Sequence, residues 1–210
     1  MRTPLVAGNW KCHLRLDSAR ALAASLRQRL QGLDGVEVAV CPTFVHLLPV
    51  KEELAGSSIR LGAQDTHWQD DVAATGEVGP AMLAELVSYV IIGHSERRYQ
   101  FGESDEAVRR KLEAALARGL LPILCVGETS QERVRGHTQA VLERQMRSAL
   151  EGLGRCMAWW WPTSRCGPSA PGARPRRPTP RRPPAFCGRL WRAWPALARP
   201  NAYASSTAAA

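Results

Sequence analysis

Short apolar runs alternate with longer amphipathic segments through the first 151 residues, and this alternation is the feature that most constrains the fold. Five of the short runs have the length and the apolar composition expected of buried strands. These runs are Leu5–Gly8, Val36–Cys41, Ile59–Ala63, Tyr89–Ile92 and Pro122–Val126. Strict alternation of strands and helices predicts a parallel sheet with right-handed crossovers. We therefore predict an α/β fold that contains five βα units.

Three amphipathic helices stand out among the longer segments. The first is expected to begin near Asp17, a favourable N-cap residue, and to end near Gly32. The second begins near Ser104, and the third covers about His137–Glu151. Their apolar residues are spaced by three and four, which predicts one buried face for each helix. The residues expected to be buried are Ala19, Leu22, Ala23, Leu26 and Leu30 in the first helix, Val108, Leu112, Ala115 and Leu116 in the second, and Val141, Leu142, Met146, Ala149 and Leu150 in the third.

Polar side chains directly follow two of the predicted strands. His94 and Glu96 come just after the fourth strand, and Asn9 and Lys11 come just after the first. Ligands of parallel βα proteins bind at the carboxyl ends of the strands, so these groups predict chemistry on an anionic substrate. Two plainer readings remain open. The segment after residue 93 can be a helix start with charged surface residues, and Lys11 can be an exposed lysine.

Six short motifs extend this pattern along the chain. They are Ala7–Lys11, Gln64–Asp65, Ala74–Val78, Gly93–Arg98, Phe101–Glu103 and Cys125–Glu128. In order and spacing they resemble the triosephosphate isomerase family, and the resemblance covers roughly residues 3–151. It implies a (β/α)8 TIM barrel, a fold that typically needs about 250 residues. We expect only the first five βα units to be present in recognisable form.

The resemblance also implies a reaction and roles for the strand-end residues. The family moves a proton between adjacent carbons of dihydroxyacetone phosphate and glyceraldehyde 3-phosphate through an enediolate, and it is itself the familiar example of a neutral histidine electrophile working with a glutamate base. By resemblance His94 polarises the substrate carbonyl, Lys11 supplies positive charge to the substrate, and Asn9 is a hydrogen-bonding partner beside it. Glu96 is implied to pair with Lys11 or with a nearby base. Its other reading is an acid favoured by a helix N-terminus.

Further residues are implied to be structural or to take part in assembly. The segment Thr75–Glu77, with Gly76 at its centre, resembles the loop that inserts into a partner subunit, so the family implies a homodimer. For this chain the dimer is left open, because about three units are missing. Arg97 and Glu103 resemble a structural ion pair, and Cys125 resembles a buried structural cysteine. The resemblance implies no cofactor and no metal, and triose phosphate as the small-molecule partner.

The composition changes abruptly after Glu151. The whole chain has a net charge of +9 and a pI near 9.9, which alone would suggest nucleic acid or an anionic membrane as partner. The first 151 residues, however, carry 18 basic and 19 acidic residues. The rest carry 10 Arg and no acid, with 10 of the 15 Pro and 5 of the 7 Trp. We predict a partial barrel over residues 1–151 and an irregular or disordered tail over 152–210.

The tail has the character of a triosephosphate isomerase gene translated in the wrong reading frame. Back-translated and shifted, the stretch that begins just before Trp159 can read VVVAYEPVWAIGTG, which resembles the family's sixth strand and its phosphate-gripping loop. The same shift across Pro200–Ala210 can read ERVRILYGGS, which resembles the seventh strand and a Gly-Gly phosphate loop. We infer a frameshift near Leu150–Ala158. The glutamate base then falls at the seam of Thr163 and Ser164, so the base and both phosphate loops are absent as written.

Several classes of protein are disfavoured by the sequence. No apolar run approaches the ~20 residues of a membrane span, and the N-terminus has no signal-like apolar core. The six Cys show no CxxC pair and no zinc spacing, which favours reduced thiols and the cytoplasm. Because no run can span a membrane and the excess of basic residues lies in the tail, we expect neither a membrane nor nucleic acid as partner. We favour a triosephosphate isomerase of glycolysis and gluconeogenesis that is inactive or severely impaired as written. The alternatives are another sugar-phosphate enzyme on the same barrel, and a non-catalytic βα module whose basic tail binds nucleic acid.

Overall fold

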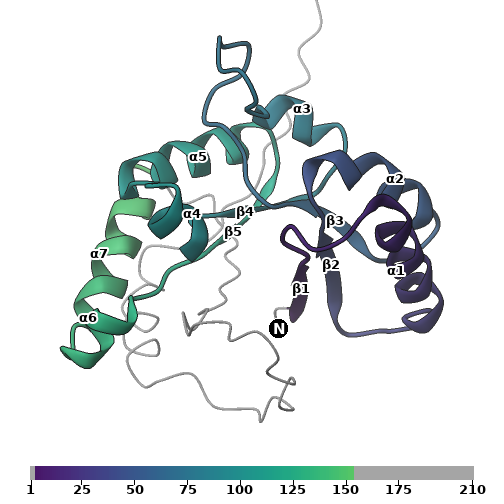
Figure 1. Ribbon diagram of the computed structural model, residues 1–210, viewed down its shortest axis with the longest axis horizontal. Helices are drawn as coiled ribbons and strands as arrows, with labels where there is room; N and C mark the ends of the chain where they lie inside the picture. Colours follow the sequence, from purple (N-terminus) through teal and green to yellow (C-terminus); the bar gives the residue numbers. More distant parts are fainter. Residues whose placement is uncertain (1–2, 154–210) are drawn as a thin grey trace, which may run out of the picture. The chain divides into compact units, whose positions relative to one another are not determined.

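The structure is a computed structural model that describes residues 3–153, and it contains a parallel five-stranded sheet with helices along its outer side (Figure 1). The strands lie in chain order, each hydrogen-bonded to the next. Their bounds are β1 Leu5–Asn9, β2 Glu37–Cys41, β3 Arg60–Ala63, β4 Tyr89–Ile92 and β5 Leu121–Leu124. The predicted parallel α/β fold with five βα units is therefore confirmed for this part of the chain.

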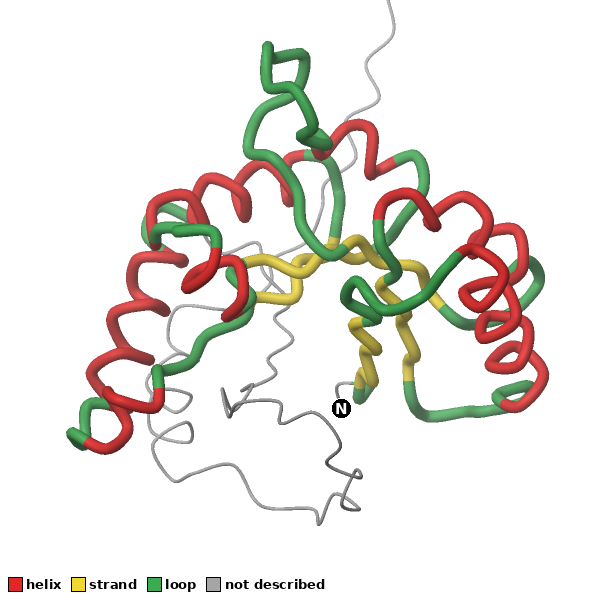
Figure 2. The backbone as a smooth tube through the Cα atoms, in the orientation of Figure 1, coloured by secondary structure: helices red, strands yellow, loops and turns green. Residues whose placement is uncertain are grey.

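The helices form the outer layer of the curved unit, as Figure 2 shows in red against the yellow strands. Among them α1 packs against α2, and α5 packs against α7, β4 and β5. The helices are α1 Leu16–Arg29, α2 Leu47–Glu53, α3 Pro80–Ala84, α4 Ser95–Gln100, α5 Asp105–Ala117, α6 Ser130–Val134 and α7 Thr138–Leu150, with a 3-10 turn at Phe44–His46 before α2.

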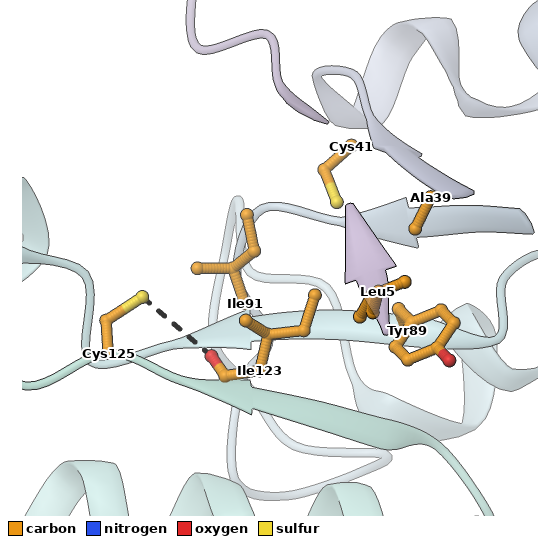
Figure 3. Close-up of a cluster of buried hydrophobic side chains, with 7 residues drawn as sticks. All are labelled: Leu5, Ala39, Cys41, Tyr89, Ile91, Ile123 and Cys125. Carbon is orange, nitrogen blue, oxygen red and sulfur yellow. Dashed lines mark hydrogen bonds between the residues drawn. The ribbon is translucent and has the colours of Figure 1, made fainter. Parts of the chain in front are cut away.

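One cluster of buried side chains lies on a single face of the sheet, contributed by alternate residues of the strands (Figure 3). Its members are Leu5, Ala39, Cys41, Tyr89, Ile91, Ile123 and Cys125. Gly62 of β3 faces this cluster, because a Cβ at that position would stand 2.6 Å from the Cys41 sulfur and 3.1 Å from the Tyr89 Cβ. The intervening residues of β4, Val90 and Ile92, are also buried, whereas Val6 of β1 is exposed. Burial on both faces explains why β4 reads as a continuous apolar run, and the expectation of a buried strand is wrong for the middle of β1.

Two helix predictions need correction. Helix α1 begins at Leu16 with Arg15 as its N-cap, so the prediction of Asp17 as the cap is wrong. Asp17 lies in the first turn, where its charge still favours the helix dipole. Ala19 and Ala23 are fully buried, but Leu22 is exposed and Leu26 is only half-buried. The buried face of α1 is therefore narrower than the spacing of its apolar residues predicted. The residues buried on that face are the small side chains Ala19 and Ala23.

Strand β5 is shorter at its carboxyl end than predicted. Its pairing with β4 stops at Ile92 and Leu124, because β4 itself ends there. Cys125 and Val126 lie beyond the ladder, although the Cys125 backbone N–H still donates to the Ile92 carbonyl at 2.8 Å. The last pairing therefore places Cys125 at the edge where the polar strand-end residues lie.

Two polar side chains are buried on helix faces where the sequence predicted apolar residues alone. Gln145 of α7 accepts from the Gly127 backbone N–H at 2.9 Å and donates to the Gly127 carbonyl at 3.1 Å. Lys111 of α5 is buried between the carboxylates of Asp65 and Glu103. These two side chains are each satisfied by partners outside their own helix, as burial requires.

No helix within residues 3–153 is long and apolar enough to cross a membrane. The predicted irregular tail from residue 154 onward, most of the region of the inferred frameshift, and the seam of Thr163 and Ser164 fall outside the described residues.

Candidate active site

The predicted strand-end residues share one edge of the sheet. Asn9 ends β1 and pairs in register with Cys41, which ends β2. Gln64 directly follows β3, and His94 is the second residue after β4. Since all strands are parallel, these positions lie at the carboxyl edge, where ligands of βα proteins bind.

Lys11 is held by contacts to both its backbone and its side chain. Its Nζ donates to the Glu96 carboxylate at 2.6 Å, and its backbone N–H donates to Asn9 Oδ1 at 2.9 Å. The residue has a φ of 52°, in the left-handed region that side chains with a Cβ rarely adopt. Lysine, amide and carboxylate, predicted separately from two motifs, thus come together in the fold.

His94 is the N-cap of α4, and its ring orientation follows from that position. Nδ1 accepts a hydrogen bond from the Glu96 backbone N–H at 3.3 Å. A nitrogen that accepts carries no proton, so the neutral ring carries its proton on Nε2 and can donate from there. Nδ1 also lies 3.5 Å from Glu96 Oε2. This contact is not an ion pair while the ring is neutral.

The electrostatics of the cluster favour a neutral imidazole beside an ionised carboxylate. Burial lowers the pKa of His94, the positive charge of Lys11 lowers it further, and Glu96 partly opposes both. The pKa of Glu96 is lowered chiefly by the hydrogen bond from Lys11, against the opposing effect of burial. At neutral pH the cluster therefore presents an ammonium group and a neutral N–H donor.

The His94 ring is expected to titrate below its ordinary pKa of 6.5 in an NMR pH titration of the full chain. Because the unfolded chain then binds more protons, the free energy of unfolding should fall as pH drops below about 6.5. Lys11→Met should raise the pKa of His94, since the ammonium lowers it, although burial remains. An ordinary or raised value in the wild-type chain would contradict the neutral ring.

Arg98 fixes the backbone that leads into His94. Its Nε donates to the Gly93 carbonyl at 2.8 Å, and its guanidinium also pairs with Asp105 at 2.6 Å and reaches the Cys125 carbonyl at 3.4 Å. Gly93 has a φ of 72°, and a Cβ there would stand 3.1 Å from the Cys125 carbonyl. Glycine is therefore required at the turn between β4 and α4.

Known proteins share this arrangement of sequence and fold. The triosephosphate isomerase family model matches residues 4–158. The chain belongs to the triosephosphate isomerase family. The triosephosphate isomerases of Carboxydothermus hydrogenoformans and Dehalococcoides mccartyi are 52% and 50% identical to it over 154 and 153 residues, 73% of this chain and 61% and 60% of theirs. The chain thus spans about three-fifths of these relatives' length.

A solved structure gives the same result for the fold. The crystal structure of triosephosphate isomerase from Bartonella henselae superposes with a TM-score of 0.67 at 38% identity, over 72% of this chain and 63% of that one. The TIM-barrel resemblance inferred from the motifs is therefore confirmed as the fold family, and members of the triosephosphate isomerase family are isomerases.

Arg97 and Glu103, the predicted ion pair, belong to a larger cluster of charged side chains. Arg97 Nε lies 3.9 Å from Glu103 and closer, at 3.0 Å, to Asp65. Lys111 Nζ contacts both carboxylates, at 2.7 Å for Asp65. Cys125, predicted to be structural, is buried, and its sulfur faces the Ile123 carbonyl (Figure 3). Two cations and two carboxylates therefore tie α4 and α5 to the end of β3.

The segment Thr75–Glu77 is exposed and belongs to the loop that projects between β3 and α3 in Figure 1. The base of this loop is closed by hydrogen bonds from the His67 N–H to the Val78 carbonyl and from the Ala81 N–H to Asp70. The loop is thus anchored at its base while its tip faces outward.

Sequence reasoning gave no role to three residues of the site region: Gln64, Arg98 and Lys111. Gln64 and Arg98 belong to two of the six motifs, Gln64–Asp65 and Gly93–Arg98. Lys111 lies on the face of its helix that was predicted to be buried, and a lysine on such a face indicates a buried charged partner. Within residues 3–153, no group of three or more His, Cys, Asp or Glu is placed to hold a metal ion.

Proposed function

We propose that this chain derives from a triosephosphate isomerase that interconverts dihydroxyacetone phosphate and glyceraldehyde 3-phosphate, and that the chain as written is inactive or severely impaired. The observation that carries the proposal is the cluster of Lys11, Glu96 and His94 at the carboxyl edge of the sheet. Membership of the family supports the same substrate class.

In this mechanism negative charge develops on the substrate oxygen as a carboxylate base removes a carbon-bound proton. A neutral His94 donates from Nε2 to that oxygen, and Lys11 stabilises the charge electrostatically. Glu96 has a different part, because it holds the ammonium of Lys11 and is therefore a positioning carboxylate. Asn9 fixes the backbone of Lys11 from the other side.

The impairment follows from the sequence after Glu151, which holds no Asp or Glu at all. The inferred frameshift puts Thr163 and Ser164 where the glutamate base would be read, and it also removes the two loops that bind phosphate. We propose on these grounds that residues 1–151 are a partial TIM barrel and that residues 152–210 are an out-of-frame translation of the same gene.

A chimera tests the proposed function. Residues 1–151 are joined to the C-terminal remainder of the Carboxydothermus hydrogenoformans relative, and the product is assayed on glyceraldehyde 3-phosphate and on other aldose and ketose phosphates. Turnover of glyceraldehyde 3-phosphate alone is expected. Preference for another sugar phosphate would favour a different enzyme on the same barrel, and a folded but inactive chimera would overturn the proposal.

Lys11→Met in this chimera is expected to lower kcat/KM for glyceraldehyde 3-phosphate by about 10²–10³-fold, the usual cost of removing one preorganised group that stabilises a developing oxyanion. Lys51→Met is the matched control, because Lys51 lies on α2 and donates to the Glu85 carbonyl, away from the cluster. Steady-state kinetics of both variants check the prediction. Equal activity of Lys11→Met and the control would remove Lys11 from the mechanism.

A homodimer in the cytoplasm is the assembly and location that we propose for the intact enzyme. The exposed loop tip at Thr75–Glu77 supports it, as do four exposed apolar side chains from the 3-10 turn at Phe44–His46, α2, the loop before α3, and α3. These are Val45, Leu48, Val72 and Met82. Sedimentation velocity of the chimera tests the dimer, and a monomer at micromolar concentration would contradict it.

A further inference from the structure

Gln64 uses its side-chain amide to join two backbone carbonyls at the candidate active site. Its Nε2 donates to the Cys41 carbonyl at 2.8 Å and to the Lys11 carbonyl at 3.0 Å. An amide nitrogen has two hydrogens, so both donors are occupied. Gln64 thereby connects the ends of β1, β2 and β3 at one point.

The Lys11 backbone needs such support because its conformation is intrinsically unfavourable. A φ of 52° crowds the Cβ of any residue other than glycine, and Asn or Asp are the side chains that tolerate it best. Lys11 has no such advantage, yet its N–H is bound by Asn9 and its C=O by Gln64. Strained residues persist where their surroundings over-determine them, often at functional sites.

The left-handed conformation decides where the ammonium goes. It sets the direction of the Cα–Cβ bond, and from there the side chain reaches Glu96 at 2.6 Å. If the residue relaxed to an ordinary conformation, the Cβ direction would change and the ammonium would leave Glu96. We propose that Gln64 is a positioning residue, which holds the left-handed backbone of Lys11 and so keeps its ammonium beside Glu96 at the substrate edge.

This inference deepens the proposed function, on which it rests for the role of Lys11 as the cation that meets substrate. The competing explanation is that Gln64 merely stabilises the fold by linking three strand ends. The two explanations differ in one observable, the electrostatic environment of Glu96. The groups whose charge lowers the pKa of Glu96 are Lys11, His94 and His13, and the hydrogen bond from Lys11 is the largest cause.

The experiment compares the full chain with Gln64→Met, which keeps the length of the side chain and removes both donors. The control is Gln28→Met, at an exposed glutamine of α1. The pKa of Glu96 is measured by NMR titration of its carboxyl carbon. It is expected to rise toward the ordinary glutamate value in Gln64→Met and to stay unchanged in Gln28→Met. An unchanged pKa of Glu96 in a folded Gln64→Met chain would overturn the proposal.

A second background separates positioning from general loosening. In Lys11→Met the hydrogen bond to Glu96 is already gone, so adding Gln64→Met should produce no further rise in the pKa of Glu96. A further rise of the same size would mean that Gln64 acts on Glu96 by another route, and it would overturn the proposal.

Two measurements keep the test decisive if Gln64→Met does not fold. In the wild-type chain the Gln64 side-chain amide hydrogens should exchange with solvent more slowly than those of Gln28, and equal rates would overturn the proposal. Gln64→Asn retains the amide on a shorter stem that cannot reach both carbonyls, so it should also raise the pKa of Glu96. None of these readouts needs turnover, so failure of the isomerase assay and failure of this inference are distinguishable.

Discussion

The chain as written is expected to isomerise glyceraldehyde 3-phosphate at least about 10²–10⁴-fold more slowly than the chimera that carries the C-terminal remainder of the Carboxydothermus hydrogenoformans relative. Positioned general bases typically contribute a factor of this size, and the sequence holds no Asp or Glu after Glu151. The two phosphate loops that the shifted reading would restore are also missing as written. Their loss adds to the deficit because binding energy from the phosphate helps to orient the reacting carbons.

The measurement is kcat/KM for both proteins, each purified from a host whose own isomerase gene has been deleted. A third protein separates the causes: the same chimera with its glutamate base replaced by glutamine. If that variant binds substrate but loses turnover, its fall in kcat/KM measures the contribution of the base. Any larger fall in the chain as written is then due to the loss of phosphate binding. Turnover by the chain as written within a few-fold of the chimera would contradict the proposed impairment.

The strands were predictable where their signal is local. Tyr89–Ile92 is a run of four buried residues, three of them β-branched, and its predicted and observed bounds agree. The end of β5 was not predictable in the same way, because it depends on where its neighbour β4 ends. Likewise the exposure of Leu22 depends on which residues approach α1, and the three- and four-residue spacing carries no information about that.

The candidate site likewise has residues that the local sequence predicts and contacts that it does not predict. Asn9, Lys11, His94 and Glu96 each follow a recognisable strand, and parallel strands bring their carboxyl ends to one edge. The contact of Gln64 with Lys11 joins residues 53 positions apart in the chain. No periodicity or turn signal specifies such a contact, because it arises from the register between strands that are not adjacent in sequence. Motif position alone therefore marked Gln64 without revealing what it binds.

Lys111→Met is expected to lower the free energy of unfolding by about 3–5 kcal/mol, the usual cost of removing one partner from a buried ion pair. The side chain of Lys111 is 3% exposed, and its ammonium lies between the carboxylates of Asp65 and Glu103, whose side chains are 10% and 4% exposed. Methionine fills the same volume but leaves two desolvated carboxylates with Arg97 as the remaining nearby cation.

Lys51→Met again provides the matched control, because it makes the same chemical change at an exposed position and should cost less than about 1 kcal/mol. Urea unfolding of the full chain at neutral pH gives both values, provided that the m-value is unchanged. Adding Glu103→Gln to Lys111→Met should recover part of the loss, since it removes one of the orphaned charges, whereas Glu103→Gln alone should destabilise. If Lys111→Met were as stable as the control, Arg97 would suffice to neutralise the cluster, and the tie between α5 and the end of β3 would depend on packing rather than on charge.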